Sequence, residues 1–377
     1  MLRNHRKRIL IAFSVIILFI PSCILSPPRE KRLPPENMGI IFEANLNGAQ
    51  DIYRISDFET QAVERLTFTP DDFESFLLVS DDGRYASFVI HGPDRASPWD
   101  LYKLDLESLE TSQINTRESG LPPTYPLGWA VGEHQILVPD YQGTSLYKID
   151  LDNDSVEKVD LPSQRQIRPT HCQYSYDKKF VACDLFDKWT NPIISSYIYV
   201  LETKEEIQLG GEDEYCFQPE WSPAENKILL HCFFDTEDIA RIYLYEIVED
   251  DSSVYVRKIK DVLYANPSLR ARVSAYIWSP DGKFFITTSS SINSIVYPFV
   301  IYNSDGSINK YISPSNITED MLITDISWLP DGQNILYIAG KDEESLNIYM
   351  MDTEGLNNYI VTTQPANYSN LRVYSKP

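Results

Sequence analysis

One short motif recurs along this chain at a nearly constant interval. Trp278 begins Trp-Ser-Pro-Asp-Gly-Lys, an apolar run follows it, and fifty residues later Trp328 begins Trp-Leu-Pro-Asp-Gly-Gln. A repeat of this period means that the chain consists of similar supersecondary units, and it outranks any local assignment of structure. The intervals range from 45 to 57 residues, and the earlier equivalents of Trp278 are Val79, Trp129, Tyr174 and Trp221.

Each unit predicts four short strands. One strand leads into the repeated position, and a second follows the Pro-Asp-Gly turn, as at Tyr85 to Ile90. A third ends in a motif such as Asp100 to Asp105, and a polar turn starts a fourth, as at Val156 to Val159. With 24 Tyr and 16 Phe the chain is rich in residues that suit pleated strands. Four short strands at this spacing are typical of one β-propeller blade.

The two ends of the repeat predict the number of blades. Met38 to Leu66 supplies a second, third and fourth strand but no first strand. Leu371 to Ser375 is expected to be a first strand, and Tyr374 lies 46 residues beyond Trp328. Joined in one composite blade, the two ends would leave no free sheet edge. We therefore expect an all-β, seven-bladed propeller over residues 38–377, with six or eight blades as the alternatives.

The first 37 residues have the composition of an export signal and a tether. A basic start at Arg3 to Arg8 precedes an uncharged apolar segment and then Cys23, which resembles the lipidated cysteine of a bacterial lipobox. We expect residues 1–23 to be a signal peptide lipidated at Cys23, with an ordinary cleaved signal or an uncleaved anchor as alternatives. Residues 24–37 contain four prolines and predict a stiff tether. Each version places the body in the cell envelope, periplasmic or on the outer surface, and the first anchors it to a membrane.

The repeated Trp-Ser-Pro-Asp-Gly-Lys, the apolar strand after it and the Ile-Tyr-x-x-Asp strand resemble the TolB-type propeller repeat, also called WD-repeat-like. The resemblance extends from Met38 to the C-terminus and is weakest at Trp129, where Pro-Asp-Gly is missing. The fold that it implies hosts binding scaffolds, lyases and the gating domains of peptidases. Fold analogy by itself therefore selects no function.

Charge and cysteine content restrict the partners and the chemistry. The net charge of −22 argues against a nucleic-acid partner, because phosphate binding needs a basic surface. Four cysteines remain beyond Cys23. Cys216 and Cys232 are predicted to lie opposite each other on two strands and could form a disulfide, whereas Cys172 and Cys183 are expected to lie diagonally. Buried free thiols are the alternative for both pairs.

No cofactor and no metal site is predicted. His171 and His231 lie in adjacent units, but no Cys-x-x-Cys or His-x-x-x-His motif accompanies them. Asp150, Asp152 and Asp154 match part of a calcium loop, yet the glycine and the final glutamate are missing, which favours an acidic hairpin. We expect the repeated aromatic residues to pack between neighbouring sheets rather than to bind a ligand.

The loops between second and third strands share one face of a propeller and fall outside the repeat. Aromatic and charged residues concentrated there fit a recognition surface, although ordinary loop anchoring explains any single one. The candidate binding residues are Trp99, Tyr141, Phe186, Trp189, Phe234, Arg95 and Lys188.

We therefore expect a non-enzymatic binding propeller that recognises a protein or a glycan through this loop face. The alternative is a lyase or glycosidase acting in the central channel. His91, His134, His171 and His231 fall at different positions of their units, which favours the scaffold. Three or more charged side chains meeting in the channel, with His or Arg among them, would favour the enzyme.

Overall fold

The computed structural model describes residues 36–376, with gaps at 47, 49, 70–72, 81, 93–98, 117–120, 122–123, 131–133, 141–144, 160–167, 187–193, 212–213, 235–236, 251–252, 263–271, 291–297 and 319. The predicted signal peptide and nearly all of the predicted tether lie outside these residues. Every regular element in the described part of the chain is a strand. No helix that could cross a membrane occurs among the residues described.

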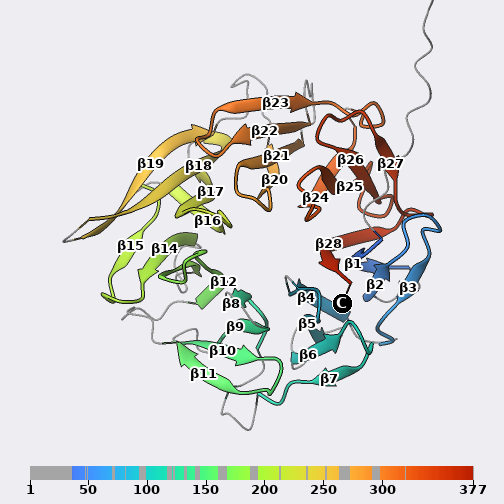
Figure 1. Cartoon of the computed structure of the whole chain (residues 1–377), viewed down its shortest axis with the longest axis horizontal. Helices are drawn as coiled ribbons and strands as arrows, with labels where there is room; N and C mark the ends of the chain where they lie inside the picture. Colours follow the sequence, from blue (N-terminus) through green and yellow to red (C-terminus); the bar gives the residue numbers. More distant parts are fainter. Residues whose placement is uncertain are drawn as a thin grey trace, which may run out of the picture. The chain divides into compact units, whose positions relative to one another are not determined.

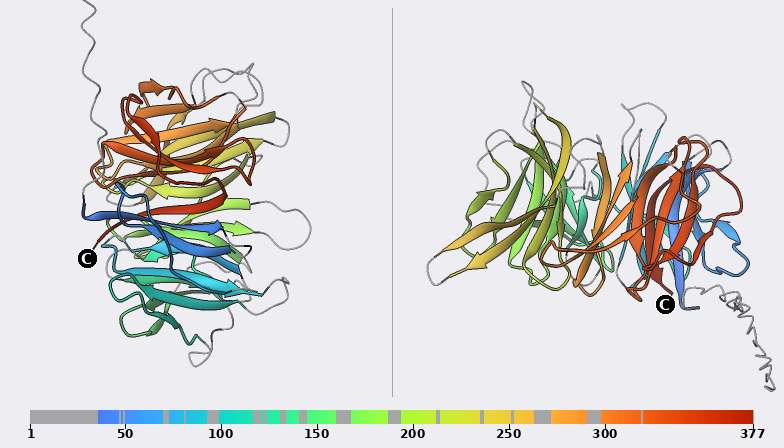
Figure 2. Two further views of the ribbon diagram at one scale, coloured as in Figure 1. Left: turned by 90° about the vertical axis from the view of Figure 1, so that its right-hand side faces the viewer. Right: turned by 90° about the horizontal axis from the view of Figure 1, so that it is seen from above.

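Seven antiparallel sheets of four strands each surround a central channel (Figure 1). This confirms the predicted seven-bladed propeller. Seen from the side, the blades lie next to one another around the ring (Figure 2). The blades, from the innermost strand outward, are β4 (Phe73–Val79), β5 (Tyr85–His91), β6 (Asp100–Asp105) and β7 (Thr111–Gln113); β8 (Gly128–Ala130), β9 (Gln135–Pro139), β10 (Leu146–Asp150) and β11 (Val156–Val159); β12 (Arg168–Tyr174), β13 (Phe180–Phe186), β14 (Ile194–Val200) and β15 (Glu206–Gln208); β16 (Glu214–Trp221), β17 (Lys227–Phe234), β18 (Glu237–Glu249) and β19 (Val254–Val262); β20 (Arg272–Trp278), β21 (Phe284–Ser290), β22 (Phe299–Asn303) and β23 (Ile308–Ile312); β24 (Leu322–Trp328), β25 (Asn334–Gly340), β26 (Asn347–Asp352) and β27 (Asn358–Ile360); and β28 (Asn367–Ser375), β1 (Met38–Asn45), β2 (Gln50–Ile55) and β3 (Val63–Arg65).

The last of these blades joins the two ends of the chain, as the repeat count predicts. Strand β28 supplies the innermost strand and pairs with β1, with Tyr374 opposite Gly39. A Cβ atom at Gly39 would lie 2.6 Å from the Tyr374 ring, so the missing side chain makes room for this aromatic residue. The ring of sheets is thereby closed by ladder hydrogen bonds instead of ending in two free edges.

The repeated turn is held by its own side chains. In the unit of Trp278, the Ser279 hydroxyl accepts the Phe284 N–H at 3.0 Å and donates to the Asp281 carboxylate at 2.8 Å. Gly282 then takes a φ of 67°, in the left-handed region that favours glycine. The turn that starts at Ser175 has Lys178 at the corresponding place with a φ of 63°, so the geometry persists where glycine is absent.

The repeated aromatic residues join neighbouring blades. Trp278 is 3% exposed, and its indole N–H donates to the Glu220 carbonyl of the preceding blade at 3.1 Å. Trp221 repeats the contact one blade earlier, donating to the Gln173 carbonyl at 3.1 Å. Trp278 and Trp221 therefore bury a large apolar area and also satisfy their indole N–H.

Two disulfides fasten inner strands to second strands. One joins Cys216 of β16 to Cys232 of β17, which are register partners, as the sequence places them. The other joins Cys172 of β12 to Cys183 of β13. The sequence-based diagonal placement of this second pair was wrong. The ladder runs without interruption from Tyr174 opposite Val181 to Cys172 opposite Cys183, because the bulge of β12 lies beyond the cysteine, between Pro169 and His171.

His134 connects two blades by ion pairs. Its Nε2 lies 2.7 Å from the Asp82 carboxylate of the preceding blade, and its Nδ1 lies 2.9 Å from Asp152. Burial alone would lower the pKa of His134, but the hydrogen bonds to both carboxylates outweigh it and hold that pKa above the ordinary value. The turn that contains Asp152, expected to be a plain acidic hairpin, thus takes part in a contact between blades.

This geometry predicts a pH-dependent contribution to stability. Because the folded-state pKa is raised, the contribution is complete below the ordinary histidine pKa of about 6.5 and is lost as the pH rises through the folded-state value. His134→Gln should lower the melting temperature at about pH 5.5 and have little effect at about pH 8.5, with a loss below roughly 1 kcal/mol because both carboxylates are half exposed. The double variant Asp82→Asn/Asp152→Asn should reproduce this pattern. An equal loss at both pH values would contradict the charged state of His134.

Candidate functional site

Six of the seven innermost strands are interrupted by a β-bulge at the same level. The register shifts once in each of β4, β12, β16, β20, β24 and β28. The seventh inner strand, β8, is only three residues long. Bulges re-aim side chains and expose backbone groups, and they are over-represented next to active sites. Their alignment around the ring makes this level of the channel the first place to look for a site.

Three of these bulges contain a non-glycine residue with positive φ. The angles are 61° at Phe76 in β4, 55° at Gln218 in β16 and 49° at Asn370 in β28. This conformation costs an L-residue roughly 1–2 kcal/mol. Such strain persists only where the surroundings over-determine the backbone, and it concentrates at functional sites.

Buried carboxyl groups of the preceding blade hold these three bulges. The Glu43 carboxyl accepts the Leu77 N–H at 3.1 Å, next to Phe76. In the same way the Asp184 carboxyl accepts the Gln218 N–H at 2.6 Å. Asp325 accepts the Leu371 N–H at 2.8 Å, next to Asn370. Each carboxyl thus satisfies a backbone donor that the bulge has taken out of the ladder.

A cavity of about 610 Å³ opens at the level of the bulges. The inner strands β12, β16, β20, β24 and β28 line it, and these strands face the centre of the ring (Figure 1). Its lining includes titratable or charged groups that could act on a substrate, among them His171, Glu220, Asp325 and Arg372. They come from four different blades, so the closed ring is what brings them together.

Glu220 has the properties of a proton-transfer group. Its side chain is half-buried and accepts a hydrogen bond from the Gln173 amide at 3.0 Å. Burial raises the pKa of Glu220 to about 7, against the opposing effects of Gln173 and Arg372. A carboxyl group with a pKa near the working pH can both take up and release a proton.

Arg372 supplies positive charge to the cavity, and His171 is neutral. One Arg372 guanidinium nitrogen lies 4.0 Å from the Asp325 carboxylate and donates to the Leu371 carbonyl at 2.8 Å. Burial raises the pKa of Asp325, and Arg372 acts in the opposite direction. Burial also lowers the pKa of His171 to about 4, helped by the nearby charge of Arg372. At neutral pH the cavity therefore holds a fixed cation, an uncharged imidazole and carboxyl groups that resist ionisation.

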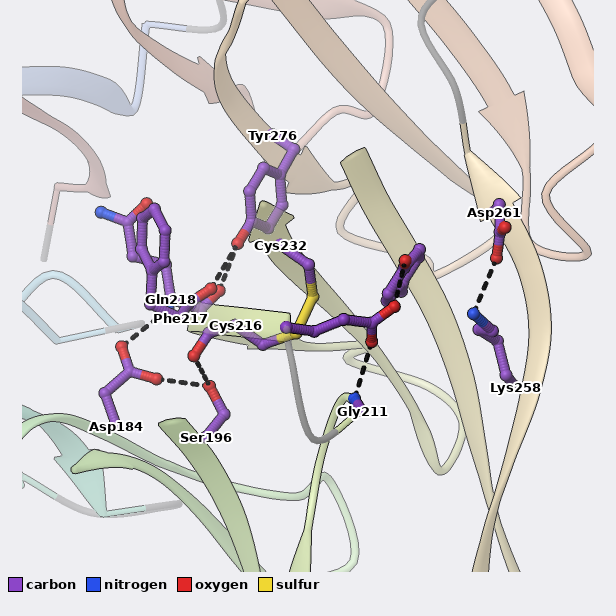
Figure 3. The surroundings of a disulfide bond; sticks show 12 residues. Asp184, Ser196, Gly211, Cys216, Phe217, Gln218, Cys232, Lys258, Asp261 and Tyr276 are labelled. Carbon is purple, nitrogen blue, oxygen red and sulfur yellow. Dashed lines mark hydrogen bonds and ion pairs between the residues drawn. A yellow bond between two sulfur atoms is a disulfide. The ribbon is translucent and has the colours of Figure 1, made fainter. Parts of the chain in front are cut away.

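A hydrogen-bond network behind the cavity involves Asp184 (Figure 3). Ser196 Oγ lies 2.6 Å from the Asp184 carboxyl and 3.0 Å from the Cys216 carbonyl oxygen. The hydroxyl has one proton and the carbonyl can only accept, so a protonated Asp184 completes the chain by donating to Ser196. Burial raises the pKa of Asp184 to about 7, in agreement with this arrangement.

Tyr276 joins the cavity to the same bulge. It lines the cavity, and its hydroxyl donates to the Gln218 carbonyl in the neighbouring inner strand, as Figure 3 shows. Burial, together with the negative charge of Asp184 and Glu220, raises the pKa of Tyr276 well above its usual range. The strained loop of β16 is therefore fixed from two sides, by Asp184 and by Tyr276.

The predicted loop-face site is seen only in part. Trp99 is half-buried and packs on Phe76, His91 and Tyr125, with ring centroids 5.4, 5.4 and 5.5 Å away. Four of the other candidates, Tyr141, Trp189, Arg95 and Lys188, lie outside the described residues. The side chains of the remaining two, Phe186 and Phe234, lie outside them as well. In the part of the chain that is described, no group of three or more His, Cys, Asp or Glu is placed to hold a metal ion.

Sequence reasoning missed the cavity residues except for His171. Their signal is present nonetheless, because Glu220 and Asp325 are charged residues within first strands that precede a repeated tryptophan. When one unit is considered alone, a charged residue in a strand is predicted to face solvent. Only the register of several blades together shows that these positions meet in the channel.

No protein-family model and no curated protein sequence matches the chain. Solved structures share its fold at low identity. An oligogalacturonate lyase from Vibrio parahaemolyticus is 16% identical, with a TM-score of 0.56, over 83% of this chain and 85% of that one. A periplasmic gluconolactonase from Pseudomonas aeruginosa is 11% identical, with a TM-score of 0.58, over 90% and 100%. A prolyl endopeptidase is 11% identical, with a TM-score of 0.58, over 92% of this chain but 50% of the other. Identities this low establish a shared fold.

These findings correct the expectation of a non-enzymatic binding propeller. Several of the similar solved structures are named as enzymes, among them a lyase, a lactonase and a peptidase. In addition, His171, Glu220, Asp325 and Arg372 line one cavity, which is the convergence that we took above as the mark of an enzyme. The seven-bladed fold stands, while the TolB-type comparison gains no specific support from these structures.

The Asp184 network yields a stability prediction. A raised folded-state pKa means that the stabilisation is present below the ordinary aspartate pKa of about 4 and is lost as the pH rises through about 7. Asp184→Asn keeps one donor and one acceptor, so it should weaken this pH dependence and unfold at a higher temperature than the natural protein at about pH 8. Asp184→Ala should cost about 1–3 kcal/mol throughout, because the Gln218 N–H loses its acceptor. If Asn and Ala are equally damaging at every pH, Asp184 is charged and the account of the network fails.

Proposed function

We propose that the protein is an enzyme that carries out acid–base chemistry on a carbohydrate substrate in the central channel. The observation that supports this most strongly is the meeting of Arg372, Glu220, Asp325 and His171 on the wall of one 610 Å³ cavity. The size suits one or two sugar rings, since pockets for small molecules span about 300–1,000 Å³. Among acid–base reactions, the arrangement best fits β-elimination from a uronic acid glycoside.

In this reaction Arg372 binds the carboxylate of the sugar and stabilises the negative charge that develops there. Ionised Glu220 removes the proton from the carbon next to that carboxylate. The released electron pair forms a carbon–carbon double bond, the bond to the glycosidic oxygen breaks, and that oxygen takes up a proton from solvent. A base whose pKa is raised to about 7 by burial is stronger than an ordinary glutamate and is still available at neutral pH.

The unusual electrostatics of the cavity favour an anionic substrate despite the acidic chain. Burial raises the pKa of Glu43, Asp184 and Asp325, and each of these carboxyl groups accepts a backbone N–H. Asp325 lines the cavity, so its negative charge is reduced where the substrate would bind, and Arg372 can attract a carboxylate there. A solved structure that shares this fold is named as an oligogalacturonate lyase, which is consistent with a uronide as substrate.

Glycoside hydrolysis is the second candidate, because Glu220 and Asp325 are two carboxyl groups in one cavity. Glycosidases use such a pair with one group protonated and the other ionised. The two reactions are told apart by their products. Elimination gives an unsaturated uronide that absorbs ultraviolet light, and hydrolysis gives a new reducing end without that absorbance.

The activity should depend on both Glu220 and Arg372. With a mixture of oligouronides as substrate, Glu220→Gln should lower kcat about 10²- to 10⁴-fold, since it removes the base. Arg372→Ala should lower kcat/KM about 10²- to 10³-fold through loss of charge stabilisation, and Arg372→Lys should recover part of it. For the natural protein, kcat/KM should rise with pH through about 7 as Glu220 ionises.

Glu225→Gln, in the exposed turn after β16, is the matched control and should retain full activity. Ultraviolet-absorbing product that forms at the natural rate in the Glu220 and Arg372 variants would contradict this assignment. A reducing end formed without absorbance would favour the glycosidase.

We also propose that the chain is exported and anchored to a membrane by a lipid on Cys23. The basic start, the apolar segment and the cysteine support this, and an envelope location would suit an enzyme acting on extracellular polysaccharide. Two cross-strand disulfides are consistent with an oxidising compartment.

Metabolic labelling tests the anchor. Cells that express the full chain and are fed a radioactive fatty acid should label the natural protein, and Cys23→Ala should lose the label. Cys172→Ala, which removes a different cysteine, is the control and should remain labelled. Label retained in Cys23→Ala would refute lipidation at this residue.

A further inference from the structure

Five aromatic rings form a continuous cluster beside the channel. Phe76 lies 5.4 Å from Trp99 and 5.1 Å from Tyr125, measured between ring centroids. His91 stacks on Trp99 at 5.4 Å, and Phe73 stacks on His91 at 5.8 Å. We call these five residues the aromatic platform. They come from β4, the end of β5 and the segments that lead into β6 and β8, so several elements support one surface.

Phe76 is the exposed member of the platform. It keeps 40% of its surface accessible although it is a large apolar residue, and its backbone has a φ of 61°. A bulky side chain in this region is a genuine outlier. The strain is maintained by Glu43, whose buried carboxyl accepts the next N–H, of Leu77. The fold thus keeps the ring of Phe76 exposed in a strained backbone conformation. Neither the backbone preference of phenylalanine nor burial of the ring explains this, which points to a function for the ring.

The repeat shows where Phe76 lies. In β16 and β28 the strained residues of the bulge are Gln218 and Asn370, and both line the channel cavity. Phe76 is the strained residue of the corresponding bulge in β4. Strand β4 stands next to β28, which bears Arg372 (Figure 1). Phe76 thus occupies, on the strand next to β28, the position that corresponds to the cavity-lining residues Gln218 and Asn370.

We propose that the aromatic platform is a second sugar-binding subsite, in which Phe76 stacks on the apolar face of the ring next to the one whose carboxylate Arg372 binds. This proposal rests on the proposed function and narrows it: the bound uronide is joined to a second sugar ring, not to a non-sugar group. The C–H face of a pyranose ring needs a flat apolar surface of fixed orientation. Phe76, which packs against Trp99 and Tyr125, provides one on the inner strand next to the strand that bears Arg372.

Binding and turnover of uronides of increasing length test the proposal. The natural protein should bind a trigalacturonate more tightly than galacturonate, and part of this gain should depend on Phe76. Phe76→Asn removes the ring and suits the left-handed backbone, so it is expected to fold. It should weaken trigalacturonate binding roughly five- to tenfold, the factor that one aromatic stacking contact is worth, and leave galacturonate binding unchanged. Phe76→Tyr should retain the affinity.

Two controls accompany these variants. Tyr176→Ala removes another exposed aromatic residue, which is 46% exposed in a turn away from the platform, and should leave the affinity for trigalacturonate unchanged. Trp99 lies in contact with Phe76, so trigalacturonate should also change the tryptophan emission. Trp99→Phe should abolish that part of the change.

The possible outcomes separate this inference from the proposed function. Phe76-dependent binding of trigalacturonate without any turnover would keep the subsite and refute the lyase. Turnover that is equally efficient in the natural protein and in Phe76→Asn, at every chain length, would keep the lyase and refute the subsite. A lower melting temperature for Phe76→Asn with unchanged affinity would show that the ring serves packing only, and would also refute the subsite.

Discussion

A buried carboxyl group that accepts a backbone N–H from the next blade is the interaction on which the channel depends. Glu43, Asp184 and Asp325 each make this contact, at 3.1, 2.6 and 2.8 Å. Without it, the bulges at Phe76, Gln218 and Asn370 would leave donors unsatisfied inside the propeller. With it, the inner strands bend at one level, and the side chains of several blades turn into one cavity. The carboxyl groups lose hydration in the exchange, which is why burial raises the pKa of each of them.

The proposed chemistry depends on the raised pKa values of these buried carboxyl groups. Because burial keeps carboxyl groups such as Asp325 from ionising readily, the cavity carries less negative charge than the acidic chain as a whole would suggest. Glu220, with a pKa raised to about 7, can then serve as a base, and Arg372 can stabilise an anion. The two disulfides lie directly behind this region, since Cys172 follows His171 and Cys216 precedes the bulge of β16. The same features therefore stabilise the inner strands and shape the cavity.

The fold could be predicted from the sequence to a large extent, because it is encoded in local repeated signals. The turn after Trp278, the strands on either side of it and the position of Tyr374 are enough to predict seven blades and the composite closure. The Cys172–Cys183 pairing was misplaced for a physical reason. In β16 the bulge lies between the turn and Cys216, whereas in β12 it lies beyond Cys172, and the sequence does not show where along a strand a bulge falls.

The site was harder to predict, because it exists only in the assembled ring. Glu220, Asp325 and Arg372 lie up to 152 residues apart in sequence and on three different blades. Trp99 was predicted to be a binding residue of the loop face. In the structure it packs against Phe76 as part of the aromatic platform. Phe76 could not be predicted as a site residue, because a phenylalanine in a strand is expected to be buried. Only the structure shows its positive φ and its exposed ring.

Direct titration of the carboxyl groups by NMR, with ¹³C-labelled aspartate and glutamate, tests the central claim that the channel carboxyls are poised near neutrality. We predict two glutamate resonances, of Glu220 and Glu74, and one aspartate resonance that titrate near pH 7. One of the glutamate resonances should be missing in Glu220→Gln, and the aspartate resonance should be missing in Asp184→Asn. If every aspartate and glutamate in the natural protein is ionised by about pH 5.5, the buried carboxyls are charged and the account of the channel is wrong.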